Sequence, residues 1–348
     1  MRHKTLLILA ALAVGILGLS GTVRAASETI TLKDMGSFHI GGERVTLSGL
    51  PVKEVQTVPG GPVRKSDPNG DYMAGQMYVQ YMIQANPIAE FPLLMWHGGG
   101  LTGVTWETKP DGKPGWHTYF LRAGFSTYVS DAVERGRASW ARTEIVHSEA
   151  EHRTMNAGWG MFRFGPAEGY NTDPAKRIAY EGQLFPVASL EQFWRQSVAR
   201  WTTSTPATKK AYLELMDKLG PSILVAHSQG GSFALNVSQD APDKFKAIVL
   251  VEPSGAPNPE KVDVSKVKGI KYLVIWGDYF DKSALWQSYR GNVEKYLDAV
   301  RKAGATVDVL DLPTMGIKGN SHMLMMDTNS DEVAALALAW LKKQGLAK

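Results

Sequence analysis

The stretch that decides the fold is Ile223-Leu224-Val225-Ala226-His227-Ser228-Gln229-Gly230-Gly231-Ser232. Its apolar run predicts a buried strand, and the apolar residues among positions 233–237 predict a helix directly after it. One serine and two glycines separate the two elements, so the chain has to turn sharply. Such a turn needs small side chains, because the strand and the helix pass close to each other. The pattern predicts that Ser228 lies at the top of a sheet, where its hydroxyl is a candidate nucleophile.

One residue departs from the usual form of this turn. That form is Gly-x-Ser-x-Gly, and Ala226 stands where the first glycine is expected. Alanine has the next smallest side chain, so the sharp turn is still possible. The alternative interpretation is an ordinary strand-to-helix turn in another kind of α/β protein. The residues before and after the stretch have to decide between the two.

The N-terminus has the composition of a secretory signal peptide, over residues 1–26. Residues 2–4 form a basic start, residues 6–19 are apolar, and Val23-Arg24-Ala25 supplies small residues before a cleavage site. The apolar run is short for a hydrocarbon layer of about 30 Å, and no stop-transfer segment follows. We expect a secreted or periplasmic protein without a stable membrane anchor after leader removal. The alternative is a retained N-terminal anchor.

The remaining composition excludes several classes of function. The 348 residues can form two domains or one large core with an insertion, and we expect one α/β domain over residues 27–348. Loss of the leader removes Arg2, Lys4 and Arg24, which leaves 35 basic residues against 34 acidic ones. The whole-chain pI of 9.0 therefore says little, and no basic stripe indicates a nucleic-acid partner. The absence of cysteine excludes disulfides, thiol catalysis and cysteine-ligated metals.

The chain before residue 90 has the pattern of antiparallel strands. Residues 29–32, 38–40, 43–47 and 76–83 alternate between apolar and polar side chains. The pair Gly41-Gly42 predicts a hairpin turn between the second and third of these strands. Residues 51–70 are rich in Pro, Gly, Asp and Asn, which is typical of a surface loop.

From residue 91 onward strands and helices alternate. Strands are expected at residues 91–96, 125–129, 245–251, 272–276 and 306–310, and helices at 116–123, 208–219 and 286–303. A last amphipathic helix follows, with Ser330 as its expected N-cap. The alternation is typical of a mostly parallel sheet built from βαβ units, with the N-terminal antiparallel strands added to it.

The alternation breaks between residues 140 and 206, which are rich in aromatic side chains with scattered Gly and Pro. We expect this segment to form a cap inserted over the carboxyl edge of the sheet. The alternative reading is that most of its aromatic residues fill an ordinary core.

A serine nucleophile needs a base, and the base needs an acid that orients it. Of the eight histidines, only His322 lies beyond the strand-turn-helix stretch, in the loop after the last expected strand, so it is the candidate base. His227 is expected to point to the opposite side of the turn. Glu252 closes the apolar run of the next strand, so its carboxylate is expected to be partly buried at the sheet edge. A carboxylate there needs a partner such as a histidine. Asp278 and Asp281 follow the strand after that, where position slightly favours them, but they could equally cap a helix, so the acid stays open.

Backbone amides are needed to stabilise the oxyanion of an acyl-transfer reaction. The residues His97-Gly98-Gly99-Gly100 follow an apolar strand, and glycine lets the backbone come close to a substrate. Gly99 is the candidate for one amide donor. Gln229, directly after the nucleophile, is the candidate for the other.

Taken together, four motifs resemble the secreted bacterial esterases of the 713 type, which are α/β-hydrolases. They are His97-Gly98-Gly99-Gly100-Leu101-Thr102-Gly103 with Trp106-Glu107, Ala226-His227-Ser228-Gln229-Gly230, Val251-Glu252-Pro253, and Ser321-His322. The resemblance runs from about residue 93 to the C-terminus and implies an α/β-hydrolase fold. It also implies that Glu252 is the acid. Some members carry a vicinal cysteine pair in the oxyanion loop, where this chain has Gly99 and Gly100, so a role for a disulfide is not implied.

The expected function is that of a secreted serine carboxylesterase that acts on small-molecule esters without a cofactor or metal. Ser228, His322 and Glu252 form the expected triad, and Gly99 and Gln229 the oxyanion hole. An amidase or lactonase with the same residues is one alternative. The other is a non-catalytic exported binding protein on the same fold. The sequence does not fix the oligomeric state, for which a homodimer is one possibility.

Overall fold

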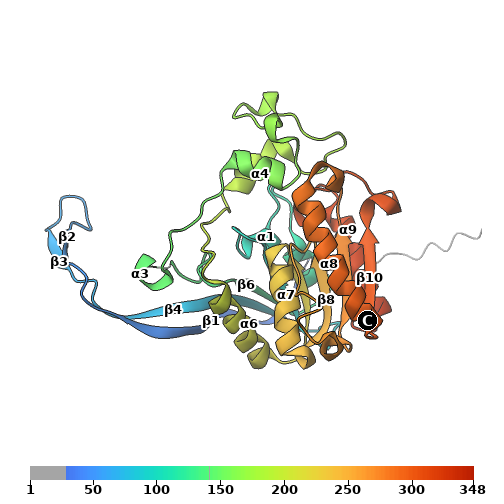
Figure 1. The fold of residues 1–348 in the computed structure, drawn as a ribbon, viewed down its shortest axis with the longest axis horizontal. Coiled ribbons are helices and arrows are strands. Elements are labelled where there is room, and N and C mark those ends of the chain that lie inside the picture. Colours follow the sequence, from blue (N-terminus) through green and yellow to red (C-terminus); the bar gives the residue numbers. More distant parts are fainter. Residues whose placement is uncertain (1–28, 141) are drawn as a thin grey trace, which may run out of the picture.

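The computed structural model describes residues 29–140 and 142–348, so the expected signal peptide lies outside the described residues. An eight-stranded sheet runs through the molecule in the order β1-β4-β6-β5-β7-β8-β9-β10 (Figure 1). From β6 to β10 the neighbouring strands are parallel, whereas β1 and β4 are antiparallel additions at one edge. The predicted fold class, an α/β-hydrolase fold with a mostly parallel sheet and N-terminal antiparallel strands, is confirmed.

The elements have the following bounds. The strands are β1 Leu32–Leu47, β2 Lys53–Val55, β3 Arg64–Ser66, β4 Gly70–Gln84, β5 Leu93–Trp96, β6 Thr127–Asp131, β7 Ser222–His227, β8 Phe245–Val251, β9 Lys271–Trp276 and β10 Thr306–Asp311. The α-helices are α1 Val104–Glu107, α2 Trp116–Arg122, α3 Thr143–Val146, α4 Met155–Met161, α5 Leu190–Trp194, α6 Thr205–Leu219, α7 Gln229–Asp240, α8 Ala284–Lys302 and α9 Ser330–Lys343. Short 3-10 helices lie between several of them.

Each face of the sheet has its own hydrophobic core, because successive side chains of a strand point to opposite faces. Leu224, Ala226 and Leu250 pack with residues of α6, α7 and α8. Val225 and Val249 pack on the other face, with residues of α2 and α9 and with aromatic residues from the segment after β6. The central strands are buried on both faces, which explains why they read as unbroken apolar runs in the sequence.

The N-terminal strands differ from the expectation. Gly41 and Gly42 do not form a hairpin turn, because β1 runs through them as one strand of 16 residues and pairs with β4 along its length. Both glycines have positive φ, and a Cβ atom at Gly41 would lie 2.8 Å from Cβ of Ala211 in α6. The absence of a side chain at Gly41 therefore lets α6 pack against the strand.

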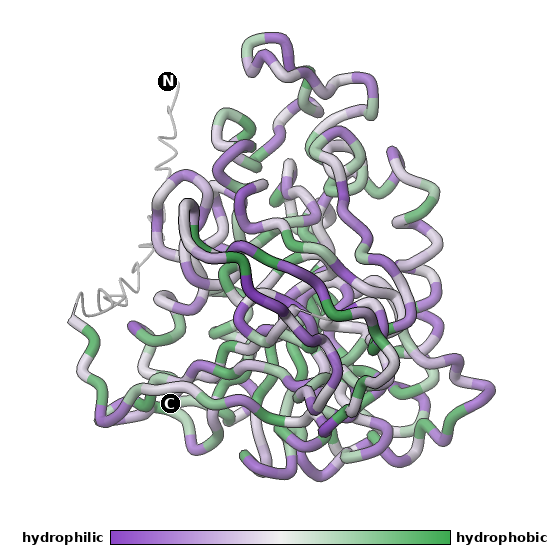
Figure 2. The backbone as a smooth tube through the Cα atoms, turned by 90° about the vertical axis from the view of Figure 1, so that its left-hand side faces the viewer, coloured by the Kyte–Doolittle hydropathy of each residue, from purple (hydrophilic) through white to green (hydrophobic). Residues whose placement is uncertain are grey.

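The arm formed by β1 and β4 extends away from the rest of the sheet (Figure 1). Figure 2 looks toward this arm, where hydrophobic and hydrophilic residues alternate along the strands. The expected surface loop at residues 51–70 holds a small two-stranded sheet, β2 and β3, at the tip of the arm. At the C-terminal end, α9 begins at Ser330 but Asn329 occupies the N-cap position, so the expected cap was wrong by one residue.

The segment between β6 and α6, which includes the expected cap at residues 140–206, contains short helices and loops. It lies above the sheet in green in Figure 1. Most of its aromatic side chains are buried, whereas Trp140 is 70% exposed. Its function as a cap stays a prediction. No helix in the described ranges is long and apolar enough to cross a membrane.

Candidate active site

Ser228 lies in the sharp turn between β7 and α7. Its φ of 51° and ψ of −116° are outside the regions that a serine normally occupies. The close packing of the turn explains the glycine that follows: a Cβ atom at Gly230 would lie 2.6 Å from the carbonyl oxygen of His97. Ala226 is fully buried in the strand before the turn, so the residue that departs from the usual pattern is accommodated.

His322 and Glu252 are in direct contact although they are far apart in the sequence. Nδ1 of His322 lies 2.9 Å from Oε2 of Glu252, and both side chains are buried. An ionised carboxylate only accepts hydrogen bonds, so Nδ1 carries the proton and Nε2 of His322 keeps its lone pair. Oε1 of Glu252 accepts a hydrogen bond from the backbone N–H of Gly277 at 2.6 Å.

The two aspartates that remained open as the acid have other partners. Asp278 accepts hydrogen bonds from the backbone N–H groups of Tyr279 and Gly319. Asp281 pairs with the neighbouring Lys282 on the surface. Neither aspartate caps α8, because Ser283 accepts the hydrogen bond from the first turn of that helix. The contact with His322 is made by Glu252.

Arg163 is a site residue that the sequence analysis did not identify. It is fully buried, and its Nη2 donates to both carboxylate oxygens of Glu252, at 2.6 and 2.7 Å. Its Nε donates to the carbonyl oxygen of Asp278, and its guanidinium lies 4.2 Å from the ring centre of Phe280. A buried carboxylate needs a counter-charge, and Arg163 supplies it. No local motif marks this arginine, because it reaches Glu252 from the segment between β6 and α6.

The rings of Trp286, Phe162 and His227 pack around the imidazole of His322. The ring of Trp286 is 3.9 Å away and that of Phe162 is 5.7 Å away, between centroids. His227 was expected to point to the opposite side of the turn, and this was wrong. Its Nε2 donates to the carbonyl oxygen of His322 at 3.0 Å, and its ring lies 4.5 Å from that of His322. His227 therefore fixes the backbone that carries the candidate base.

Asp327 hydrogen-bonds the two residues that precede His322 in its loop. Its carboxylate accepts hydrogen bonds from the backbone N–H and hydroxyl of Ser321 and from the side chain of Asn320. Burial raises the pKa of Asp327 to about 7. This polar network is fully buried, so it holds the loop in one conformation.

Gly99 and Gln229, the candidates for the oxyanion hole, lie next to each other. A Cβ atom at Gly99 would be 3.1 Å from Oε1 of Gln229. The backbone N–H of Gln229 is at the first position of α7, where helix geometry supplies no intrahelical acceptor. His97 anchors the glycine loop, because its Nδ1 donates to the carbonyl oxygen of Gly98 and its Nε2 accepts from the N–H of Ala132.

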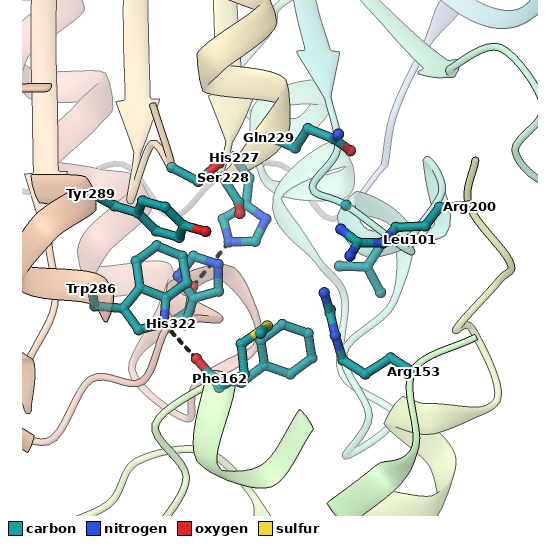
Figure 3. A pocket seen from close by; sticks show the side chains of 13 residues that line it. Leu101, Arg153, Phe162, Arg200, His227, Ser228, Gln229, Trp286, Tyr289 and His322 are labelled. Atoms are coloured by element: carbon teal, nitrogen blue, oxygen red, sulfur yellow. Dashed lines mark hydrogen bonds between the residues drawn. The ribbon is translucent and has the colours of Figure 1, made fainter. Parts of the chain in front are cut away.

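A cavity of about 230 Å³ brings these residues together. Ser228, His322, Gly99 and Gln229 all line it, and Figure 3 shows Ser228 and His322 facing the same space. Within the described part of the chain no hydrogen bond joins the hydroxyl of Ser228 to His322. Glu252 lies behind His322 and does not line the cavity. No three His, Asp or Glu side chains of the described residues are arranged to hold a metal ion.

Comparison with known proteins agrees with this architecture. A sequence model of the alpha/beta hydrolase fold matches residues 169–333. A bacterial esterase of known structure is 34% identical, with a TM-score of 0.79, and the match covers 91% of this chain and 98% of the esterase. The chain belongs to the α/β-hydrolase family. A probable secreted lipase from a fungal species (strain ATCC 74256) is 26% identical over an alignment of 337 positions, and the match covers 79% of this hydrolase and 88% of the lipase.

The surroundings of His322 lead to a prediction for the pH dependence of this α/β-hydrolase. Burial, and then the positive charges of Arg163 and Arg153, hold the pKa of His322 well below its usual value of 6.5. Glu252 would normally raise that pKa, but Arg163 neutralises its charge. A base has to be unprotonated to act, so we expect the acid limb of kcat/KM for p-nitrophenyl butyrate to have its midpoint below pH 6.5.

A pH–rate profile at constant ionic strength measures this midpoint. The enzyme must be shown to remain folded across the range, by circular dichroism at each pH. A midpoint above pH 6.5 in a folded enzyme would mean that Glu252 controls the pKa of His322 despite Arg163.

Proposed function

We propose that this α/β-hydrolase is a secreted carboxylic-ester hydrolase that uses a Ser228-His322-Glu252 triad. The observation that carries the proposal is the 2.9 Å contact between His322 and Glu252 beside a cavity that Ser228 also lines. The strained backbone of Ser228 supports its role as nucleophile, since strain of this kind is concentrated at functional sites. The names of the bacterial esterase and the fungal lipase support an ester as substrate.

The proposed reaction has two halves. The hydroxyl oxygen of Ser228 attacks the ester carbonyl while Nε2 of His322 takes the hydroxyl proton. The backbone N–H groups of Gly99 and Gln229 stabilise the negative charge on the carbonyl oxygen. His322 then protonates the leaving alcohol, and the carbon–oxygen bond of the ester breaks to leave an acyl-enzyme. Water then gives a proton to Nε2 of His322 and attacks the acyl carbon. The bond between this carbon and Oγ of Ser228 breaks, His322 returns the proton to Oγ, and the acid is released.

Glu252 orients and stabilises His322 during both halves. While His322 carries the extra proton, the carboxylate lies next to a positive imidazolium, and its hydrogen bond to Nδ1 strengthens. Arg163 and the N–H of Gly277 keep the carboxylate in place, so the imidazole does not have to reorient between the two halves.

The size of the cavity leads to a prediction about the acyl group. At about 230 Å³ the cavity is smaller than most small-molecule sites, which measure about 300–1,000 Å³. We expect kcat/KM for p-nitrophenyl acetate or butyrate to exceed that for the palmitate ester by about 100-fold. Hydrolysis of p-nitrophenyl esters of rising acyl length by the purified mature protein measures this ratio.

This experiment tests separately whether the protein hydrolyses esters and whether the cavity limits the length of the acyl chain. Hydrolysis of none of the esters would contradict the proposed function. Preference for the palmitate ester would leave the esterase activity in place and contradict the conclusion drawn from the cavity. The same panel extended to lactones and anilides distinguishes an ester hydrolase from a lactonase or an amidase.

The proposed location outside the cytoplasm rests on two observations. The first 26 residues have the composition of a signal peptide, and the fungal relative carries the description of a secreted protein. N-terminal sequencing of the exported protein tests this, with cleavage expected close to residue 26.

A further inference from the structure

Two arginines from the segment between β6 and α6 line the cavity beside the glycine loop. A Cβ atom at Gly99 would lie 3.6 Å from Nη1 of Arg200, and one at Gly100 would lie 3.9 Å from Nη1 of Arg153. Figure 3 shows both guanidinium groups on the side of the cavity opposite Trp286 and Tyr289. The two positive charges therefore lie next to the candidate oxyanion hole.

Among the described residues, Arg200 forms a salt bridge with a carboxylate and Arg153 does not. No Asp or Glu is among the residues that line the cavity. Arg200 pairs with Glu151 at 2.6 Å, on the partly exposed outer side. Arg153 forms no salt bridge with a carboxylate in the described part of the chain, although the charge of Glu151 acts on it from a distance. Its guanidinium lies 5.2 Å from the ring centre of Phe162, in a cation–π contact. Burial and the charge of Arg200 lower the pKa of Arg153, which remains protonated.

A third arginine, Arg135, adds to the positive charge on the side of the cavity that Arg153 and Arg200 line. Arg135 is only 4% exposed, and its charge and that of Arg200 repel each other. Glu134 lies beside Arg135, but it faces a separate cavity lined by Trp140 and Trp201. Three arginines thus share two nearby carboxylates, Glu134 and Glu151, and neither of these lines the catalytic cavity. An anion bound in the cavity would give Arg153 a carboxylate in direct contact, which Glu151 gives only to Arg200.

We propose that the substrate carries a carboxylate on its acyl part and that Arg153, assisted by Arg200, binds this carboxylate. The proposal rests on the proposed ester hydrolysis. The leaving alcohol has to lie next to His322, which is packed against Trp286. The arginines lie across the cavity from these residues, so they face the acyl part. The planar guanidinium matches a carboxylate with two parallel hydrogen bonds. The small cavity restricts the acid to a short chain, so the substrate class is monoesters of short dicarboxylic acids.

The test compares two esters that differ only in charge. Monomethyl glutarate carries a free carboxylate, and methyl glutaramate carries a neutral amide of the same size in its place. Release of methanol gives kcat/KM for each, and the ratio of the two values is the readout. We expect the native enzyme to prefer the charged ester by at least about tenfold, the effect of one charge-assisted hydrogen bond. Raising the salt concentration should reduce this preference.

Variants assign the preference to Arg153. Arg153→Gln should lower the ratio by about tenfold, and Arg153→Lys should restore part of it, because lysine keeps the charge without the planar geometry. Arg195→Gln is the matched control, since Arg195 is exposed and, among the described residues, its side chain hydrogen-bonds only Gln192. That variant should keep the native ratio.

The outcomes distinguish this inference from the function on which it rests. Equal rates for the two glutarate esters in the native enzyme, or an unchanged ratio in Arg153→Gln, would overturn the role of Arg153. Hydrolysis of p-nitrophenyl butyrate without hydrolysis of monomethyl glutarate would overturn the substrate class. Failure to hydrolyse any of the three esters would instead contradict the proposed esterase function.

Discussion

Replacement of Ser228 by alanine is expected to lower kcat for p-nitrophenyl butyrate by about 10⁴- to 10⁶-fold. The variant loses the oxygen atom that attacks the ester, and no other hydroxyl stands at the end of β7 in the strained turn. The fold should be retained, because Ser228 is the N-cap residue of α7 but its side chain makes no capping hydrogen bond. Steady-state kinetics with enzyme that is free of the native form measures the loss.

A second serine of the same stretch serves as the control. Ser232 lies one turn further along α7 and does not line the cavity. Ser232→Ala should therefore keep kcat within about a factor of two, consistent with an ordinary substitution away from the site. Comparable activity of Ser228→Ala and the native enzyme would end the proposal that Ser228 is the nucleophile.

Glu252→Gln is expected to lower kcat by about 10²- to 10⁴-fold, the second largest effect. The amide cannot stabilise the positive charge that forms on His322, and its NH₂ group can face the N–H at Nδ1. Arg163 also loses its counter-charge, and an uncompensated buried charge costs about 3–5 kcal/mol of stability. The melting temperature has to be recorded beside the kinetics, and the rate measured well below it.

The two aspartates provide matched comparisons for this variant. Asp278→Asn and Asp281→Asn remove a carboxylate from the loop after the next strand, and neither residue contacts His322. We expect each of them to change kcat by less than about tenfold. A larger loss in one of the aspartate variants than in Glu252→Gln would transfer the role of the acid to that aspartate.

The parts of the molecule that the sequence predicts are those with local patterns. The strand-turn-helix around Ser228 and the buried strands on both sides of it follow from apolar runs and from glycine spacing, and the structure contains them close to the expected residues. The contact between His322 and Glu252 spans 70 residues, and the resemblance of the motifs, rather than any spacing, favoured Glu252 over the aspartates.

Other features could not be read from the sequence because they depend on distant packing. Gly41 and Gly42 have the composition of a turn, but they lie within a continuous strand, where the missing side chain of Gly41 lets α6 approach. The orientation of His227 depends on the loop that carries His322, far along the chain. Arg163 becomes a partner of Glu252 only when its own segment folds over the sheet, and nothing in its sequence neighbourhood indicates that pairing.

Labelling with a fluorophosphonate probe shows whether Ser228 is the activated nucleophile, because such a probe forms a stable adduct only with a nucleophile of this kind. Intact-mass and peptide mass spectrometry of the labelled protein locate the adduct. We expect one adduct, on Ser228, which forms in parallel with the loss of activity on p-nitrophenyl butyrate and is absent from Ser228→Ala. Loss of activity with the adduct on another residue, or full activity of a protein labelled at Ser228, would contradict the role of Ser228 as the nucleophile.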